Sequence, residues 1–216
     1  MDKTSALVLA RRAVRRGLEL AGDWLAPPAC AACDEPCRPT RSFCDVCQVS
    51  LEPAEPGKTF CAFGYGGALR SAVIRLKYEG RSDLGRPLGR LLLAAARGAV
   101  GPADLVVPVP LHPVRLAERG YNQATLLARE VAPELGSLSI ALRRREARHR
   151  QATLGREDRL SNLQGAFVAS PRAAGRSVLL VDDVCTTGAT LAACEAALRA
   201  AGASAVHTIA LARTEA

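Results

Sequence analysis

The sequence predicts an α/β protein in which helices flank a parallel sheet, with a small cysteine-rich segment at the N-terminal end. Residues 177–181 form an apolar, β-branched run typical of a buried parallel strand. Residues 191–201 follow with apolar side chains at helical spacing. Six cysteines fall within residues 30–61, a segment rich in proline and too short to bury a core of its own.

The length of 216 residues suits one main domain with an appendage. We expect residues 1–62 to hold an N-terminal helix and the cysteine-rich segment, and residues 63–216 to form the main domain. No apolar run approaches the roughly 20 residues of a membrane span. The apolar run at 6–10 is too short for a secretory signal. We therefore expect a cytoplasmic protein without a transmembrane segment.

The net charge is +8, and most of the 29 basic residues are arginines. Because arginine makes planar, bidentate contacts with phosphate, phosphorylated ligands or nucleic acid are plausible partners. A solvated basic surface without a partner is the competing interpretation. Residues 4–25 read as a basic amphipathic helix, which could dock on the protein itself or lie on a membrane surface.

The cysteine-rich segment contains two Cys-x-x-Cys pairs separated by ten residues. The pairs are Cys30/Cys33 and Cys44/Cys47. Each pair can present two thiolates to one tetrahedral ion, so we expect a structural Zn²⁺ that also supplies the folding energy of the segment. Disulfides, which a cytoplasmic chain disfavours, buried thiols and redox chemistry are the alternatives. Cys37 or Cys61 could replace a member of a pair.

Several elements of the main domain follow from apolar patterning and from glycine and proline punctuation. In order, they are a short strand and turn at 63–67, helices at 68–78 and 84–97, a core strand at 104–110, a rigid loop at 111–113, a helix after 119–123 that ends at 131, a second core strand at 138–142, strand structure from 167, and a final strand at 204–211. Lys77 and His112 read as a helix-end and a turn residue, with ligand contact as the alternative for each.

The stretch from 143 to 162 is polar and strongly basic. Its arginines are Arg143, Arg144, Arg145, Arg148, Arg150, Arg156 and Arg159. A loop of this length between two core strands is long for a compact domain, so we expect it to be functional or mobile. An ordinary solvated run of charge is the alternative.

The strand at 177–181 ends in two carboxylates, Asp182 and Asp183, which precede a short loop that opens a helix. The loop residues are Val184, Cys185, Thr186, Thr187, Gly188, Ala189 and Thr190. Unpaired backbone N–H groups and the positive end of the helix dipole converge on such a loop, which makes it an anion site. A phosphate for the loop and a vicinal diol for the carboxylates describe a ribose 5-phosphate. A nucleotide-hydrolase interpretation fails because Gly57-Lys58-Thr59 lacks the earlier glycine of a phosphate loop, where Glu52 stands.

The Asp182 to Thr190 stretch resembles the phosphoribosyl pyrophosphate (PRPP) motif of type I phosphoribosyltransferases. With the cysteine pairs, residues 76–78, 108–113 and 119–124, Gln151 and residues 159–167, the chain from about residue 30 to 213 resembles the ComF family. These are competence-associated proteins with a zinc finger and a phosphoribosyltransferase-like domain. Arg148 departs from the threonine that the family often has there, which puts in doubt any catalytic role for the start of the basic loop.

The resemblance implies that Asp182 and Asp183 accept hydrogen bonds from ribose hydroxyls and that residues 184–190 cradle the 5-phosphate. It also implies that Arg119 and the basic loop neutralise a pyrophosphate bound with Mg²⁺. Single-stranded DNA and DNA-uptake proteins are the implied partners. Three functions stay open: an active phosphoribosyltransferase, a sensor of PRPP or a nucleotide, and a handling factor for single-stranded DNA. No acceptor pocket is recognisable in the sequence.

Overall fold

A computed structural model describes residues 28–145 and 165–214. The expected helix at 4–25 and most of the basic loop, including Arg148, Gln151, Arg156 and Arg159, lie outside this range. In chain order, the elements are α2 (Asp45–Gln48), β1 (Phe60–Gly64), α3 (Gly67–Tyr78), η1 (Ser82–Leu84), α4 (Gly85–Ala96), β2 (Leu105–Pro108), α5 (Pro113–Arg119), α6 (Gln123–Leu135), β3 (Ser137–Leu138), β4 (Leu142–Arg144), β5 (Phe167–Ala169), η2 (Pro171–Ala173), β6 (Ser177–Cys185), α8 (Ala189–Ala200) and β7 (Ala205–Arg213).

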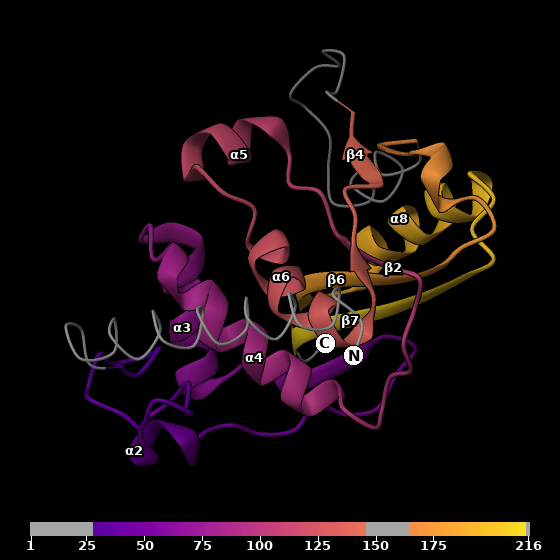
Figure 1. Cartoon of the computed structure of the whole chain (residues 1–216). Coiled ribbons are helices and arrows are strands. Elements are labelled where there is room, and N and C mark those ends of the chain that lie inside the picture. Colours follow the sequence, from indigo (N-terminus) through magenta and orange to yellow (C-terminus); the bar gives the residue numbers. More distant parts are fainter. Residues whose placement is uncertain (1–27, 146–164, 215–216) are drawn as a thin grey trace, which may run out of the picture.

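The main sheet has five parallel strands in the order β1-β7-β6-β2-β3, which confirms the predicted α/β fold class (Figure 1). The strand at 177–185 is central, as its continuous apolar run requires. Val181 pairs with Pro108 of β2 on one side and with Ile209 of β7 on the other. β2 therefore ends one residue before the level of Asp182, whereas β7 continues past both aspartates to Arg213, which pairs with Cys185.

Helices cover both faces of the sheet, because successive side chains of β6 point to opposite sides. Leu179 and Val181 join the core formed with α3, α4 and α6. Val178 and Leu180 join the core formed with α8 and the β4–β5 ribbon. Figure 1 shows α3, α4 and α6 gathered on one side and α8 on the other.

The predicted second core strand at 138–142 is wrong as a single element. Ser137–Leu138 forms β3 at the sheet edge, whereas Leu142–Arg144 pairs antiparallel with β5 in a separate ribbon. Between them the chain crosses from the sheet edge to the α8 side, so Ile140 is exposed while Ala141 and Leu142 are buried. The apolar run is therefore shared between two elements instead of facing one core.

Helix α5 was not expected from the sequence. None of its residues is buried. A helix that faces no core has no need of the repeating apolar positions by which helices are recognised in a sequence. Its end signals were nevertheless present: the His112 ring accepts a hydrogen bond from Val114 N–H (3.3 Å), Pro113 begins the helix, and Gly120 ends it at φ 79°. These end residues place α5 above the end of the sheet.

The cysteine-rich segment packs directly on the main core. Cys30, Ala31 and Phe43 are fully buried in the same cluster as residues of α3 and α4. The Ser42 hydroxyl also donates to the carbonyl of Pro87 (2.7 Å). The boundary after residue 62 stays a prediction, and in the structure that position lies inside β1. Across the described residues, no helix combines the length and the apolar character needed to cross a bilayer.

Residues 119–123 join three parts of the fold at the end of the sheet. The Tyr121 hydroxyl donates to the carbonyl of Leu76 in the last turn of α3 (2.5 Å). The Asn122 amide donates to the carbonyl of Val109 after β2 (2.9 Å), while its side-chain oxygen accepts from Ala124 N–H (3.0 Å) and caps α6. These contacts hold the end of α3 beside the exit of β2.

Replacing Asn122 should separate these two roles. Asn122→Ala loses the cap and the bond to Val109, and we expect it to lower the free energy of unfolding by about 1–3 kcal/mol. Asn122→Asp keeps an oxygen for the cap but loses the donor, and it should lower the free energy less than Asn122→Ala does. Urea unfolding measures both. An Asn122→Ala variant within about 0.5 kcal/mol of the parent would contradict the assignment, since that is the ordinary effect of a surface change.

Candidate functional site

Two adjacent carboxylates lie at the carboxyl end of β6, where parallel sheets bind ligands. Asp183 is buried, and its Oδ2 lies 2.9 Å from Nζ of Lys77 at the end of α3. Its Oδ1 accepts a hydrogen bond from Val184 N–H (2.7 Å). Oδ1 of Asp182 accepts from Asp183 N–H (2.8 Å). The backbone therefore fixes both carboxylates, and α3 supplies a cation for one of them.

The surroundings of Asp182 disfavour its ionised form. Burial, followed by the negative charge of Asp183, raises the pKa of Asp182 well above its usual range. Lys77 acts in the opposite direction but does not offset these two effects. A ligand that donates hydrogen bonds or brings a cation would therefore favour the ionised form of Asp182.

The loop after the carboxylates has the conformation of an anion site. Gly188 caps α8 at φ 75° and ψ 0°, a left-handed conformation that glycine adopts without strain. Thr186 and Thr187 are exposed, and Oγ1 of Thr187 accepts from Ala189 N–H (3.4 Å). The first N–H groups of a helix have no carbonyl partner within it, so those of α8 point into this loop.

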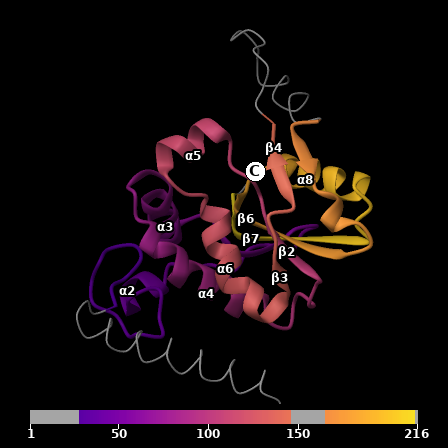
Figure 2. The same cartoon turned by 45° about the horizontal axis from the view of Figure 1, so that its top comes forward.

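Arg119 lies close to the same end of the sheet. Its Nη1 donates to Oε1 of Gln123 (2.6 Å), and its Cζ lies 5.4 Å from the ring centre of Tyr78. A cleft of about 200 Å³ is lined by Lys77, Tyr78, Gly80, Arg115, Glu118 and Arg119. Lys77 thus connects this cleft to Asp183. Figures 1 and 2 agree that α5 and β4 stand on opposite sides of the sheet end.

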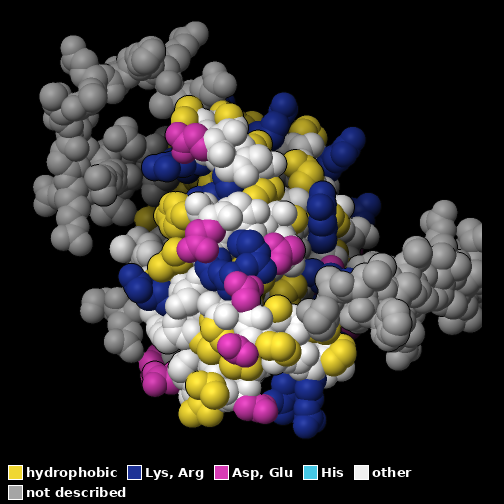
Figure 3. Space-filling model, turned by 90° about the vertical axis from the view of Figure 1, so that its left-hand side faces the viewer, with side chains coloured by type: hydrophobic (Ala, Val, Ile, Leu, Met, Phe, Trp, Pro, Cys, Tyr) yellow, Lys and Arg dark blue, Asp and Glu magenta, His cyan; other side chains and the backbone are white. Residues whose placement is uncertain are grey.

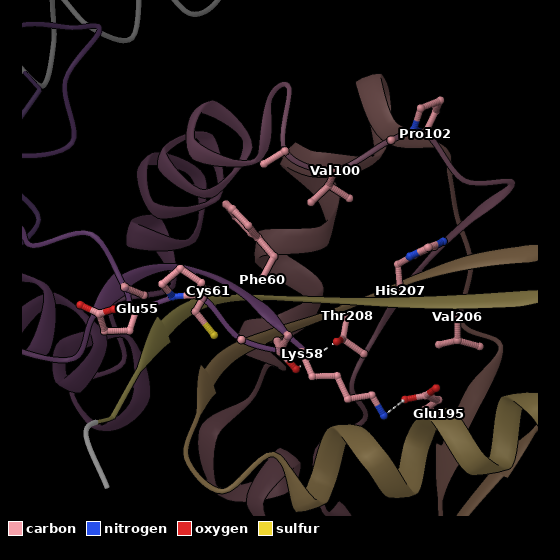
Figure 4. A pocket seen from close by; sticks show the side chains of 16 residues that line it. Glu55, Lys58, Phe60, Cys61, Val100, Pro102, Glu195, Val206, His207 and Thr208 are labelled. Carbon is pink, nitrogen blue, oxygen red and sulfur yellow. Dashed lines mark hydrogen bonds and ion pairs between the residues drawn. The ribbon is translucent and has the colours of Figure 1, made fainter.

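A larger cavity of about 610 Å³ lies between residues 54–61, the loop 99–102 and β7 (Figure 4). Its Lys58 and Glu195 pair with each other at 3.0 Å, and the hydroxyl of Thr208 donates to that of Thr59 at 3.0 Å. Val206 to Thr208 belong to the first half of β7, whereas Asp182 pairs with Ala210 further along. This cavity is therefore set back from the carboxylates, and its Lys58 and Glu195 neutralise each other.

Four cysteine sulfur atoms form a second candidate site. Those of Cys30, Cys33, Cys44 and Cys47 all lie within 4.8 Å of one another. Cys33 lies 3.8 Å from Cys44 and 3.7 Å from Cys47, sulfur to sulfur. Ligands at about 2.3 Å from a tetrahedral ion are about 3.8 Å apart, so these four sulfurs could hold one metal ion.

The two spare cysteines lie elsewhere. The thiol of Cys37 donates to the carbonyl of Arg41 (3.6 Å), and Cys61 is buried in β1. Burial raises the pKa of the Cys61 thiol to about 11. The structure therefore groups the two Cys-x-x-Cys pairs and leaves both alternatives outside the cluster.

Sequence reasoning missed how the cysteine cluster is attached. Asp34, at φ 62°, follows the first pair, and its carboxylate contacts both Arg75 and Arg81. The two guanidinium groups hold the pKa of Asp34 below its usual range. Arg75 also donates to the carbonyl of Ala31 (3.1 Å). Arg75 and Lys77 both lie in the last turn of α3, so one turn contacts both candidate sites.

Known proteins match either the C-terminal part of this chain or most of its length. The phosphoribosyl transferase domain family matches residues 117–216. Competence protein F of Haemophilus influenzae is 32% identical over 86% of this chain and 85% of its own length. The DNA utilization protein YhgH of Escherichia coli strain K12 is 31% identical over 86% of this chain and 90% of its own length.

Among solved structures, glutamine PRPP amidotransferase from B. subtilis shares 19% identity with this chain at a TM-score of 0.46. The match covers 72% of this chain and 32% of that one. The sequence relatives are closer and nearly full-length. With its phosphoribosyltransferase-type sheet and its N-terminal cysteine cluster, the chain belongs to the ComF family.

Proposed function

We propose that this protein binds PRPP with Mg²⁺ at the Asp182 to Thr190 loop and acts in the handling of internalised single-stranded DNA during natural transformation. The observation that carries the binding proposal is the arrangement at the end of β6. Two backbone-held carboxylates there directly precede a left-handed Gly188 and the N-terminus of α8. The name Competence protein F, borne by a relative, supports the cellular part of the proposal.

In this proposal the ligand divides between the two halves of the site. Asp182 and Asp183 accept the ribose hydroxyls, and the loop N–H groups with Thr186 and Thr187 take the 5-phosphate. The pyrophosphate faces the loop after Pro110, and Arg119 supplies a charge opposite to its own. Carboxylate and phosphate oxygens are the ligands that Mg²⁺ prefers, so the ion fits the donors that this pair would share with PRPP.

An active phosphoribosyltransferase is the second candidate. Displacement of pyrophosphate at the anomeric carbon places growing negative charge on the leaving group, and fixed cations such as Arg119 would stabilise it. The same cations serve a binding protein equally well. Release of pyrophosphate in the presence of acceptors separates the two, since a sensor binds PRPP without turnover.

Changes at Asp183 test the ligand site. Asp183→Ala removes an acceptor for the ribose hydroxyls, and we expect it to weaken PRPP binding by about 1–3 kcal/mol. Thr187→Ala should weaken it less, because backbone N–H groups carry much of the phosphate contact. Calorimetry with PRPP and Mg²⁺ gives both affinities, and Asp183→Asn controls for the loss of the partner of Lys77. Equal affinity of Asp183→Ala and the parent for PRPP would show that the loop is not the binding site.

We also propose that the cysteine cluster holds one structural Zn²⁺, whose preferred thiolate geometry matches the sulfur spacing. The parent and Cys37→Ser should each carry one zinc per chain, because Cys37 lies outside the cluster. Cys44→Ser should lose zinc and unfold at a lower temperature, because metal binding contributes to the folding of such segments. Elemental analysis of untagged protein and thermal unfolding are the measurements. Zinc retained by Cys44→Ser, or lost equally by Cys37→Ser, would contradict this ligand set.

Binding of single-stranded DNA should be mainly electrostatic. On the face that Figure 3 shows, basic side chains lie among acidic ones. Phe43 is buried in the core, and few aromatic rings are left for the bases to stack on. The exposed Arg143 and Arg145 border the basic loop and are the described arginines best placed to contact phosphate there.

A salt series of fluorescence anisotropy on labelled single strands tests this. Affinity should fall with a log–log slope of about −0.7 per phosphate neutralised. Charge reversal at Arg143 and Arg145 should flatten the slope. Reversal at Arg176, at the opposite end of β6, is the control and should change the slope less. Binding that is absent at low salt, or indifferent to salt, would leave the active phosphoribosyltransferase as the leading candidate.

A further inference from the structure

Tyr78 is an aromatic ring that the fold leaves open to solvent. It ends α3 and is 70% exposed, and no other aromatic residue of 28–145 or 165–214 is among the exposed large side chains. By contrast, Tyr121 is half-buried and its hydroxyl bonds to Leu76. Most of the Tyr78 ring therefore lies outside the core. The residue before it, Lys77, contacts Asp183, so the ring lies near the carboxylates.

Basic side chains lie around this ring, and one of them presents a planar guanidinium group to it. The guanidinium of Arg119 lies over it at 5.4 Å, and Arg119 is itself held by Gln123. Lys77 and Arg115 add two further cations to the cleft, and Glu118 is its single acid, 3.3 Å from Arg115. Lys77 is paired with Asp183 and Arg115 with Glu118, so Arg119 is the cation of this cleft that has no acidic partner among the described residues.

The size and the position of the cleft restrict the class of ligand that it can bind. At about 200 Å³ it is smaller than the roughly 300–1,000 Å³ of a pocket for a whole small-molecule ligand, so it suits one ring system. Its Lys77 is only 18% exposed and lies 2.9 Å from Asp183, which we assign to the ribose. A ring in the cleft would therefore lie next to a ribose held at the end of β6.

We propose that the cleft between the end of α3 and α5 binds a nucleobase, which stacks on Tyr78 while its oxygen atoms or an attached phosphate face Arg115 and Arg119. Aromatic side chains bind bases through their faces, and arginine adds cation–π and hydrogen-bond contacts. The position of the base relative to ribose rests on the proposed PRPP site, whereas base binding itself does not. The base can belong to a free nucleotide or to a single strand, since both present the same ring and phosphate.

The test uses the full-length protein and four ligands: the deoxynucleoside monophosphates, a ten-residue oligothymidylate, an abasic ten-residue strand with the same phosphates, and PRPP with Mg²⁺. The parent should bind a base-bearing ligand more tightly than the abasic strand. Binding of the monophosphates without the strand identifies free nucleotides as the source, and binding of oligothymidylate without the monophosphates identifies a single strand. Both results support the site, whereas failure of every base-bearing ligand to bind more tightly than the abasic strand overturns it.

Variants at the ring assign the effect to this cleft. Tyr78→Ala should weaken binding of the base-bearing ligand by about 5- to 150-fold, the range of stacking on one base. Tyr78→Phe keeps the ring and should stay within about threefold of the parent. Val114→Ala, an exposed change on α5 outside the cleft lining, is the matched control and should have no effect. A Tyr78→Ala variant that binds bases like the parent overturns the proposal.

The same variants separate this proposal from the one on PRPP. Tyr78→Ala should keep the parent's affinity for PRPP and Mg²⁺, and Asp183→Ala should keep the ratio by which the parent prefers oligothymidylate to the abasic strand, measured without PRPP. If the parent does not bind PRPP, the proposed ribose site is wrong, whereas the proposed base subsite is unaffected. Loss of both affinities in Tyr78→Ala with an unchanged fold would show that the residue does not act through stacking, which contradicts the assignment.

Discussion

The ion pair between Lys77 and Asp183 is the contact on which the end of the sheet depends. Two neighbouring carboxylates at the end of a buried strand repel each other and lose hydration, as the raised pKa of Asp182 reflects. A buried ion pair is not by itself a strong source of stability, yet removing one partner leaves a costly unpaired charge. Lys77 places a cation 2.9 Å from the carboxylate of Asp183. The position of α3 therefore determines the electrostatics of the strand that carries the site.

The position of α3 depends in turn on residues that touch neither carboxylate in the structure. Tyr121 holds the carbonyl of Leu76, one residue before Lys77, and Asn122 holds the carbonyl of Val109. Gly120, at φ 79°, allows α5 to end and the chain to turn into these contacts. The motif at 119–123 is thus largely a structural clasp, and Arg119 at its start is the residue that reaches the cleft.

The sequence predicts those parts of the fold in which one residue pattern belongs to one helix or strand. The run at 177–181 is apolar on both faces because helices cover both, so its burial and the following loop could be predicted. The edge run at 138–142 failed because its apolar residues serve two elements. Contacts such as Lys77 with Asp183 join residues more than a hundred positions apart, and no local pattern encodes them. The expected roles of Asp182, Asp183 and Arg119 remain proposals, although the structure places all three near one sheet end.

The last turn of α3 has a consequence for how the protein would respond to its metal supply. Arg75 contacts Asp34 and the carbonyl of Ala31 next to the cysteine cluster, and Lys77, two residues on, contacts Asp183. One turn of helix is too short and stiff for its two ends to move independently. An ion that orders the cluster would then also order Lys77, and by thermodynamic reciprocity a ligand that orders Lys77 would tighten the hold on the ion. With the metal ion and the phosphoribosyl ligand that we propose, metal starvation would disturb the loop after β6 together with the cysteine cluster, so that the availability of a trace element would influence a ligand that never touches it.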